Sequence, residues 1–216
     1  MHRKETDRKI FGAIGLIWLL ALLFGLYIRG DGGLAIDYLL LGRLHEMDLP
    51  LLNRLMHWIT ITGDPLFYVV VNAVLIVILA RQKKYPELIC LLAAVLVGWG
   101  LNEALKAAFV RTRPVGFALI EQGGFSYPSG HAMVALSWYP VAGYLLQYRR
   151  PYLAIAWQAL FIYGFLPGLS RLFLGVHYPT DVLFGHLLGL TLSYLCMRGY
   201  ATYKRKQLDS LTLTRL

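Results

Sequence analysis

Long apolar stretches alternate with short polar connections along almost the whole chain. Each stretch has close to the ~20 residues that a helix needs to cross the hydrocarbon core of a bilayer, although the second and fifth are shorter. The six predicted spans are residues 10–28, 65–80, 87–105, 131–148, 152–169 and 181–197. The pattern therefore predicts an all-α fold, a bundle of six transmembrane helices.

The connection between the first two spans, residues 30–64, has a pattern of its own. Its leucines recur at a loose helical spacing, and arginine and histidine residues lie between them. This pattern indicates one or two short helices lying in the headgroup region of the membrane. The alternative is a partly ordered loop.

Composition agrees with a membrane protein of one domain. Charged residues make up 15% of the 216 residues, whereas roughly a quarter is usual for a soluble domain. No linker, charge block or repeat divides the chain, so we expect a single domain over residues 1–216. Cys90 and Cys196 lie inside apolar runs and indicate neither a disulfide framework nor a metal site. The first span is longer than the roughly 7–15 apolar residues of a signal peptide, so we expect it to be retained.

The positions of the cations predict the orientation of the bundle. Six spans place the N-terminus, the second and fourth connections and the C-terminus on one side, together with 14 of the 21 Lys and Arg residues. Because cytoplasmic loops are enriched in Lys and Arg, this side is predicted to be cytoplasmic in a multi-pass protein of the plasma (inner) membrane. The net charge of +9 is thereby assigned to the membrane surface and not to nucleic acid.

A first polar cluster follows the third span, on the predicted extracytoplasmic side. Lys106 and Arg113 are seven residues apart, which would place them on one face of a helix that Pro114 ends. A guanidinium can contact a phosphate through two oxygens and an ammonium acts as a point charge. Cations at span ends more commonly extend to the interface, and Arg111 is interpreted in this way. Glu103 is expected to pair with Lys106.

A second cluster, Pro-Ser-Gly-His, opens the fourth span on the same predicted side. Ser129 is a good N-cap, which leaves the backbone N–H groups of Gly130 and His131 at a helix N-terminus that attracts anions. A glycine lets a phosphate approach the backbone closely, and His131 could donate a proton to a departing oxygen. The alternative is a simple cap followed by an interfacial histidine.

A third cluster lies between the fifth and sixth spans. His177 and Asp181 are four residues apart, with Thr180 as a possible N-cap. Asp181 could accept a hydrogen bond from one ring nitrogen of His177 and leave the other nitrogen nucleophilic. Arg171 would supply a further contact to phosphate. Histidine–aspartate pairs also cap helices, but three such clusters on one predicted face favour a phosphate-cleaving site.

Together the three clusters resemble one family. The ordered pattern of Lys, six residues and Arg-Pro, then Pro-Ser-Gly-His, then Ser-Arg, five residues, His, three residues and Asp is similar to the type 2 phosphatidic acid phosphatase superfamily. That family also includes vanadium haloperoxidases and bacterial acid phosphatases. Every defining position is present between Lys106 and Asp181. The Thr62-Gly63-Asp64 stretch resembles a further family feature, or is only a turn.

The resemblance implies a mechanism and a set of roles. It implies that His177 attacks phosphorus and forms a phosphohistidine, that Asp181 orients His177, and that His131 protonates the leaving oxygen and then activates water. The implied phosphate-binding residues are Lys106, Arg113, Ser129, Gly130 and Arg171. These fixed cations imply that no metal or other cofactor is needed, and that vanadate inhibits. His45, Glu46 and His57 form a weak alternative metal set.

The resemblance further implies an integral-membrane lipid phosphatase whose active site faces the extracytoplasmic side. Its substrate would be a membrane lipid phosphate such as undecaprenyl diphosphate, phosphatidylglycerophosphate or phosphatidic acid, and its partner the bilayer, with no nucleic acid. A lipid phosphotransferase on the same fold is one alternative. A non-catalytic transporter or lipid-binding protein is the other. The sequence indicates no oligomeric state.

Overall fold

The computed structural model describes residues 2–47 and 49–213, and all regular structure within these residues is helical. The helices in chain order are α1 His2–Tyr27, α2 Ala35–Glu46, α3 Pro50–Ile61, α4 Pro65–Arg81, α5 Tyr85–Phe109, α6 Gly130–Arg149, a 3₁₀ turn Pro151–Leu153, α7 Ala154–Tyr163, α8 Leu166–Phe173 and α9 Pro179–Leu213. The predicted all-α class is therefore confirmed.

Helix α6 lies at the centre of the molecule and packs against α5, α7, α8 and α9. Two glycines of α9 allow it to approach α6 closely: a Cβ atom on Gly185 would lie 2.7 Å from the carbonyl oxygen of Ser129, and one on Gly189 would meet that of Met133. Small residues permit such close backbone contact between helices in a membrane. The contact holds the first turns of α9 against the N-terminus of α6.

An aromatic cluster fixes α4 against the same central helix. The ring centroids of Tyr68 and Trp138 are 5.7 Å apart, and those of Tyr139 and Tyr163 are 5.0 Å apart, both in edge-to-face geometry. Such pairs add about 0.5–1.5 kcal/mol beyond the area that they bury. The cluster ties α4, α6 and α7 together just beside the Thr62–Asp64 turn.

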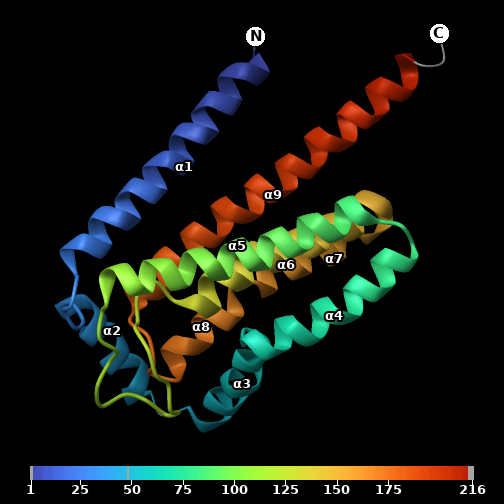
Figure 1. Cartoon of the computed structure of the whole chain (residues 1–216). Coiled ribbons are helices and arrows are strands. Elements are labelled where there is room, and N and C mark those ends of the chain that lie inside the picture. Colours follow the sequence, from blue (N-terminus) through green and yellow to red (C-terminus); the bar gives the residue numbers. More distant parts are fainter. Residues whose placement is uncertain (1, 48, 214–216) are drawn as a thin grey trace.

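The two ends of the molecule differ in what they carry. Figure 1 shows both termini toward one end, and α2, α3 and the 110–129 connection at the other. The three polar clusters lie near this second end. The first cluster begins in the last turn of α5, the second opens α6, and the third extends from α8 to the first turn of α9. They are thus brought together from across the sequence, although which end faces the cytoplasm stays a prediction.

Several predicted spans are confirmed as long apolar helices. By length and composition, Glu5–Tyr27, Tyr85–Phe109 and Pro179–Ser210 can cross a membrane, and α3 with α4 can form one more candidate span that is bent by 48°. The predicted span 152–169 is instead broken between α7 and α8. Pro167 lies in the first turn of α8, where a proline is favoured, whereas in the interior of one continuous helix it would remove a backbone hydrogen bond. The total of six spans stays a prediction.

The 30–64 connection contains two helices, α2 and α3, so the alternative of a partly ordered loop is wrong for most of it. At the start of α2, Asp37 turns back and its Oδ2 accepts a hydrogen bond from the backbone N–H of Leu34 at 3.1 Å. The carboxylate of Asp37 is fully buried. Helix α2 is therefore fixed to the rest of the molecule and does not lie apart from it.

Candidate active site

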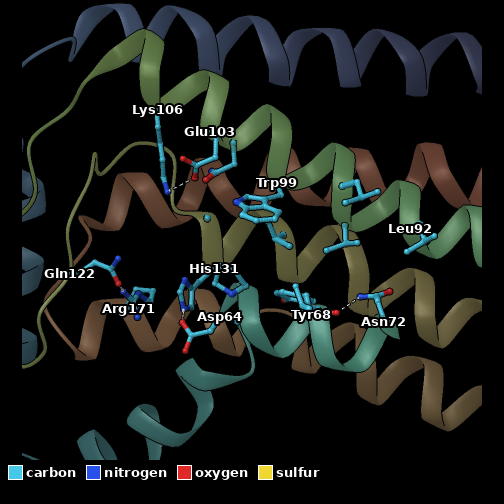
Figure 2. Close-up of a pocket in the computed structure, with 18 of the residues that line it drawn as sticks. Asp64, Tyr68, Asn72, Leu92, Trp99, Glu103, Lys106, Gln122, His131 and Arg171 are labelled. Atoms are coloured by element: carbon cyan, nitrogen blue, oxygen red, sulfur yellow. Dashed lines mark hydrogen bonds and ion pairs between the residues drawn. The ribbon is translucent and has the colours of Figure 1, made fainter. Parts of the chain in front are cut away.

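Three cations and two histidines from five separate segments line one cavity of about 590 Å³. They are Lys106 from α5, Arg113 from the 110–129 connection, His131 from α6, Arg171 from α8 and His177 from the loop before α9. Figure 2 shows Lys106, Arg171 and His131 pointing toward a common space from three sides. All five were predicted site residues, and the fold brings them together.

Arg113 reaches the cavity by a different route from the one predicted. Helix α5 ends at Phe109, and Val110 adopts a left-handed conformation with φ of 47°. This conformation is unfavourable for a β-branched residue, and it turns the chain sharply out of the helix. Lys106 and Arg113 therefore do not share a helix face, and the prediction that they do is wrong. Arg113 lines the cavity from the connection that follows the turn.

The guanidinium of Arg113 is anchored by backbone oxygens on both sides of the site. It donates to the carbonyl oxygens of Gly123 at 3.1 Å, Phe125 at 3.1 Å and Val176 at 2.8 Å. Its Nη1 also lies 3.0 Å from Nε2 of His177. Burial lowers the pKa of Arg113 to about 10, which leaves it charged at neutral pH.

Arg171 is 1% exposed, yet one of its nitrogens is unpartnered within the part of the chain that the structure describes. Its Nη1 donates to Thr60 Oγ1 at 2.7 Å, and its Nη2 contacts Gln122 Oε1. Its Nε is buried without a partner among the residues that the structure describes. An unpaired buried donor costs free energy, so Nε of Arg171 has the capacity to donate to one further acceptor.

Ser129 occupies the N-cap position of α6 as predicted, but its side chain forms no capping hydrogen bond. Within the described part of the chain its buried Oγ has no partner, and Gly130, not Ser129, lines the cavity. A Cβ atom on Gly130 would lie 2.9 Å from Asn102 Oδ1 and 3.6 Å from Lys106 Nζ. The glycine is therefore required by close packing beside the cations.

His177 and Asp181 form the predicted pair, with Nδ1 3.4 Å from Oδ2. On the other side of the ring, Nε2 faces the donating guanidinium of Arg113 at 3.0 Å. A nitrogen that accepts a hydrogen bond carries no proton, so Nδ1 carries the proton and the lone pair of Nε2 is directed at Arg113, which also lines the cavity. Burial first, and then the charges of Arg113 and Arg171, hold the pKa of His177 well below its ordinary value.

Asp181 is fully buried and has several donors around it. Ser126 Oγ donates to Oδ2 at 2.5 Å, the backbone N–H of Tyr178 donates to Oδ2 at 2.9 Å, and Arg111 Nη1 donates to Oδ1 at 2.5 Å. A buried carboxylate needs this compensation because burial penalises its charge. Ser126 was not predicted, since it lies in an irregular connection 55 residues away from Asp181 in sequence.

Arg111 is not an interfacial side chain, and this prediction is wrong. It is fully buried and joins two carboxylates, Asp37 at 2.7 Å and Asp181 at 2.5 Å. Its Nη1 also donates to Thr180 Oγ1 at 2.9 Å. The hydroxyl of Thr180 donates in turn to Asp37 at 2.9 Å. Because α9 begins at Pro179, Thr180 lies within the first turn of this helix and is not its N-cap. Through Arg111, the short helix α2 is connected to the acid that faces His177.

A second histidine–carboxylate pair faces the same cavity. His131 Nε2 lies 3.0 Å from Oδ1 of Asp64, the residue before α4. Figure 2 shows this pair below Lys106 and beside Arg171. Glu103 pairs with Lys106 at 3.1 Å, as predicted. His186 lies outside the cavity with its ring 5.1 Å from that of Phe165.

The cavity continues from the cations into an apolar groove between α4 and α5. Figure 2 shows Trp99, Tyr68, Asn72 and Leu92 along it, progressively farther from Lys106 and Arg171. Other apolar lining residues of the groove are Val69, Ala73, Ile76, Val95 and Leu96. Val69 is 58% exposed and Leu96 59% exposed. Because residues that line the groove are also exposed, the groove opens sideways at the surface of the bundle.

A family model and several known proteins are similar to this chain. Residues 87–205 match the model of the PAP2 superfamily. The chain is 41% identical over 104 residues to phosphatidylglycerophosphatase B of Bacillus subtilis (strain 168), a match that covers 46% of this chain and 51% of that protein. It is 29% identical over 206 residues to an undecaprenyl-diphosphatase of Sulfolobus acidocaldarius, covering 90% and 96% of the two chains.

Two solved structures have a similar fold. The crystal structure of a transmembrane PAP2-type phosphatidylglycerolphosphate phosphatase from Bacillus subtilis superposes with a TM-score of 0.77 at 29% identity, over 88% of this chain and 96% of that one. The crystal structure of Aquifex aeolicus LpxE gives a TM-score of 0.61 at 25% identity, over 76% and 96%. With a family match over more than half of its length, this chain belongs to the PAP2 superfamily.

Proposed function

We propose that this protein hydrolyses the phosphate of a membrane lipid through a phosphohistidine on His177. The observation that carries the proposal is the single cavity of about 590 Å³, cationic at one end and apolar along the groove between α4 and α5. A phosphate fits the first part and a lipid chain the second. The candidate substrates are undecaprenyl diphosphate, phosphatidylglycerophosphate and phosphatidic acid.

The first chemical step uses the lone pair on Nε2 of His177, which becomes free when the guanidinium of Arg113 donates to the phosphate instead. The Nε2–P bond forms as the P–O bond to the lipid breaks, and the electron pair of that bond passes to the lipid oxygen. His131 gives a proton to this oxygen. As His177 becomes positively charged, Asp181 stabilises it across the 3.4 Å contact to Nδ1.

The negative charge of the phosphoryl group is stabilised by fixed donors. Lys106, Arg113 and Arg171 line the cavity, and the backbone N–H of Gly130 lies at the N-terminus of α6. Such preorganised charges lower the barrier because they need no reorganisation during the reaction. Ser129 is proposed to contribute its unpaired hydroxyl. In the second step His131 takes a proton from water, which attacks phosphorus and releases inorganic phosphate from His177.

The direct test is phosphate release from a panel of the three candidate lipids by detergent-purified protein in EDTA. We expect release that persists in EDTA, is inhibited by vanadate and is lost in His177→Ala. The matched control is His57→Ala, an exposed histidine of α3 outside the cavity. Absence of release from every lipid would contradict the hydrolase, and activity in His177→Ala would contradict the nucleophile. The panel also ranks the substrates.

The apolar groove has a test of its own. Ala73→Phe places a ring in the groove, and we expect kcat/KM for a long-chain lipid phosphate to fall about tenfold, with little change for a water-soluble aryl phosphate. Val74→Phe is the control, since Val74 is 54% exposed on the same helix and does not line the groove. Equal effects of the two substitutions would contradict the assignment of the lipid chain to this groove.

The site is also proposed to face the extracytoplasmic side. The support is the excess of Lys and Arg at the end of the molecule that carries both termini. Labelling single cysteines in intact cells tests this. A cysteine in place of exposed Val115, near the site, should react with a membrane-impermeant maleimide, and one in place of Lys206, near the C-terminus, should react only after lysis. The reverse pattern would overturn the proposed side.

A further inference from the structure

Asp64 forms a contact that the mechanism above does not use. It precedes α4, and its Oδ1 lies 3.0 Å from Nε2 of His131, the proposed proton donor of α6. The two residues are 67 positions apart in sequence. The carboxylate therefore reaches the general acid from another part of the chain, as Asp181 reaches His177.

The orientation of the Asp64 carboxylate is not explained by capping of α4. Asp64 occupies the N-cap position, where aspartate usually accepts a hydrogen bond from the second or third helical N–H. Here its side chain forms no such bond, and Pro65 at the start of the helix has no N–H to offer. The carboxylate is directed to His131 in place of its own helix.

Contacts of the Thr62–Gly63 turn hold the Asp64 carboxylate next to His131. Thr62 Oγ1 lies 2.8 Å from the hydroxyl of Tyr163, and Tyr139 donates to the carbonyl oxygen of Thr62 at 3.1 Å. Gly63 follows, and a Cβ atom there would lie 2.5 Å from Cδ2 of His131. A side chain at this position would push the imidazole away, so the glycine is what allows the turn to lie against the ring.

The charges around His131 show what the carboxylate adds. Lys106 from α5 and Arg171 from α8 face the ring with positive charge, and His177 lies on a further side. Asp64 is the negative group among the charges that act on it. A protonated imidazole beside two cations is disfavoured unless an opposite charge is close. A general acid at this position therefore requires such a carboxylate.

We propose that Asp64 is the positioning residue of the general acid, which makes this a site with two carboxylate–imidazole pairs. Asp64 accepts the hydrogen bond from Nε2–H of His131 and stabilises the protonated ring. Nδ1 is then the nitrogen that gives its proton to the lipid oxygen as the P–O bond breaks, and that later takes a proton from water. This inference rests on the proposed function and adds a residue to it.

The test compares two leaving groups of nearly the same size. Phenyl phosphate needs a proton on its leaving oxygen, whereas 4-nitrophenyl phosphate releases a stable anion without one. In Asp64→Asn, which keeps a good N-cap residue, we expect kcat/KM to fall about tenfold or more for phenyl phosphate and less than about threefold for 4-nitrophenyl phosphate. Asp31→Asn, an exposed carboxylate outside the cavity, is the matched control and should leave the ratio unchanged.

A second measurement separates positioning from a structural role. If Asp64 acts through His131, then Asp64→Asn should cause no further loss of kcat/KM for phenyl phosphate in a His131→Gln background. Additive losses, or equal losses for the two esters in the single variant, would overturn the inference. Hydrolysis by the wild-type protein is measured first, so failure of the proposed function is recognised separately from failure of the role of Asp64.

Discussion

The two histidine–carboxylate pairs of this site differ in how their carboxylates are held. Asp181 and His177 lie four residues apart on one segment, and their side chains are 0% and 2% exposed. Asp64 precedes α4 and His131 lies in α6, and their side chains are 44% and 12% exposed. Asp181 has Arg111, Ser126 and Tyr178 as additional donors, whereas for Asp64 the structure records His131 as the side-chain partner within the described residues.

The difference follows from the physical cost of burial. A carboxylate without water must be compensated by hydrogen bonds and an opposite charge, which hold it in one place. A carboxylate that is partly in water needs less support and keeps more freedom. The buried and well-supported pair suits the proposed nucleophile, which would attack phosphorus in line. The more exposed pair suits the proposed proton donor, which would serve first the lipid oxygen and then a water molecule.

The largest expected effect separates the two histidines. We expect His177→Ala to lose at least about 10⁴-fold in turnover, since it removes the group that bonds to phosphorus. His131→Ala should still form the phosphoenzyme from 4-nitrophenyl phosphate and then accumulate it, because the water step lacks its base. Rapid quenching at alkaline pH, with phosphate bound to protein as the readout, checks both. Phosphoenzyme in His177→Ala would contradict the assignment of the two roles.

The next effect tests the support of the buried pair. Arg111→Met leaves the buried carboxylates of Asp37 and Asp181 without their shared cation, so we expect a loss of about 3–5 kcal/mol in stability. The unfolding temperature in detergent is the measurement. Arg29→Met, at an exposed arginine before α2, should leave that temperature unchanged. An unfolding temperature equal to that of the wild type would mean that the buried bridge contributes no net stability.

A smaller effect is expected from one hydrogen bond to Asp181. Ser126→Ala removes the donor at 2.5 Å from Oδ2, and hydrogen bonds to charged groups contribute about 1.5–3 kcal/mol. We expect kcat/KM for 4-nitrophenyl phosphate to fall about tenfold, because His177 is less well oriented. Ser193→Ala is the control, a buried serine of α9 whose hydroxyl bonds to Leu190 of its own helix. Similar losses in both variants would indicate a general packing effect.

The smallest expected effect is the pH dependence of folding stability that His177 causes. Because the pKa of His177 lies well below its usual value of about 6.5 in the unfolded chain, the unfolded state binds more protons. The stability contribution of neutral His177 is therefore full above about pH 6.5 and is lost as pH falls toward the native pKa. Nitrogen NMR of labelled His177 should show a neutral ring protonated on Nδ1 at pH 6.5. A ring that is half protonated there would contradict this.

Much of the site was predictable because its motifs lie at helix ends, where the sequence pattern changes. Lys106, His131 and His177 are polar residues at the ends of apolar runs, and all of them line the cavity. Asp37 was missed, since its partner Arg111 is 74 residues away and no local pattern connects them. The available signal was Asp37 itself, an acid that interrupts the apolar residues in the first turns of α2.

The fold was predictable to a similar degree, and its errors have local causes. The start of α6 was placed within one residue, because Pro128 and Ser129 precede an apolar run. The break between α7 and α8 was missed, although Gly164 and Pro167 together indicate the end of one helix and the start of another. Helix α9 continues to Leu213, well beyond residue 197. The prediction ended too early because it followed apolar residues, whereas the last turns of α9 are polar and still helical.

The sideways opening of the groove between α4 and α5 has a consequence for how this protein would meet its substrate. A lipid that enters from the bilayer does not have to leave it, so only its phosphate loses contact with water. The encounter then takes place in two dimensions, and the amount of lipid per membrane area sets its frequency. Diluting the lipid phosphate with an inert phospholipid should slow hydrolysis, whereas diluting the vesicles with buffer should leave the rate per enzyme molecule unchanged.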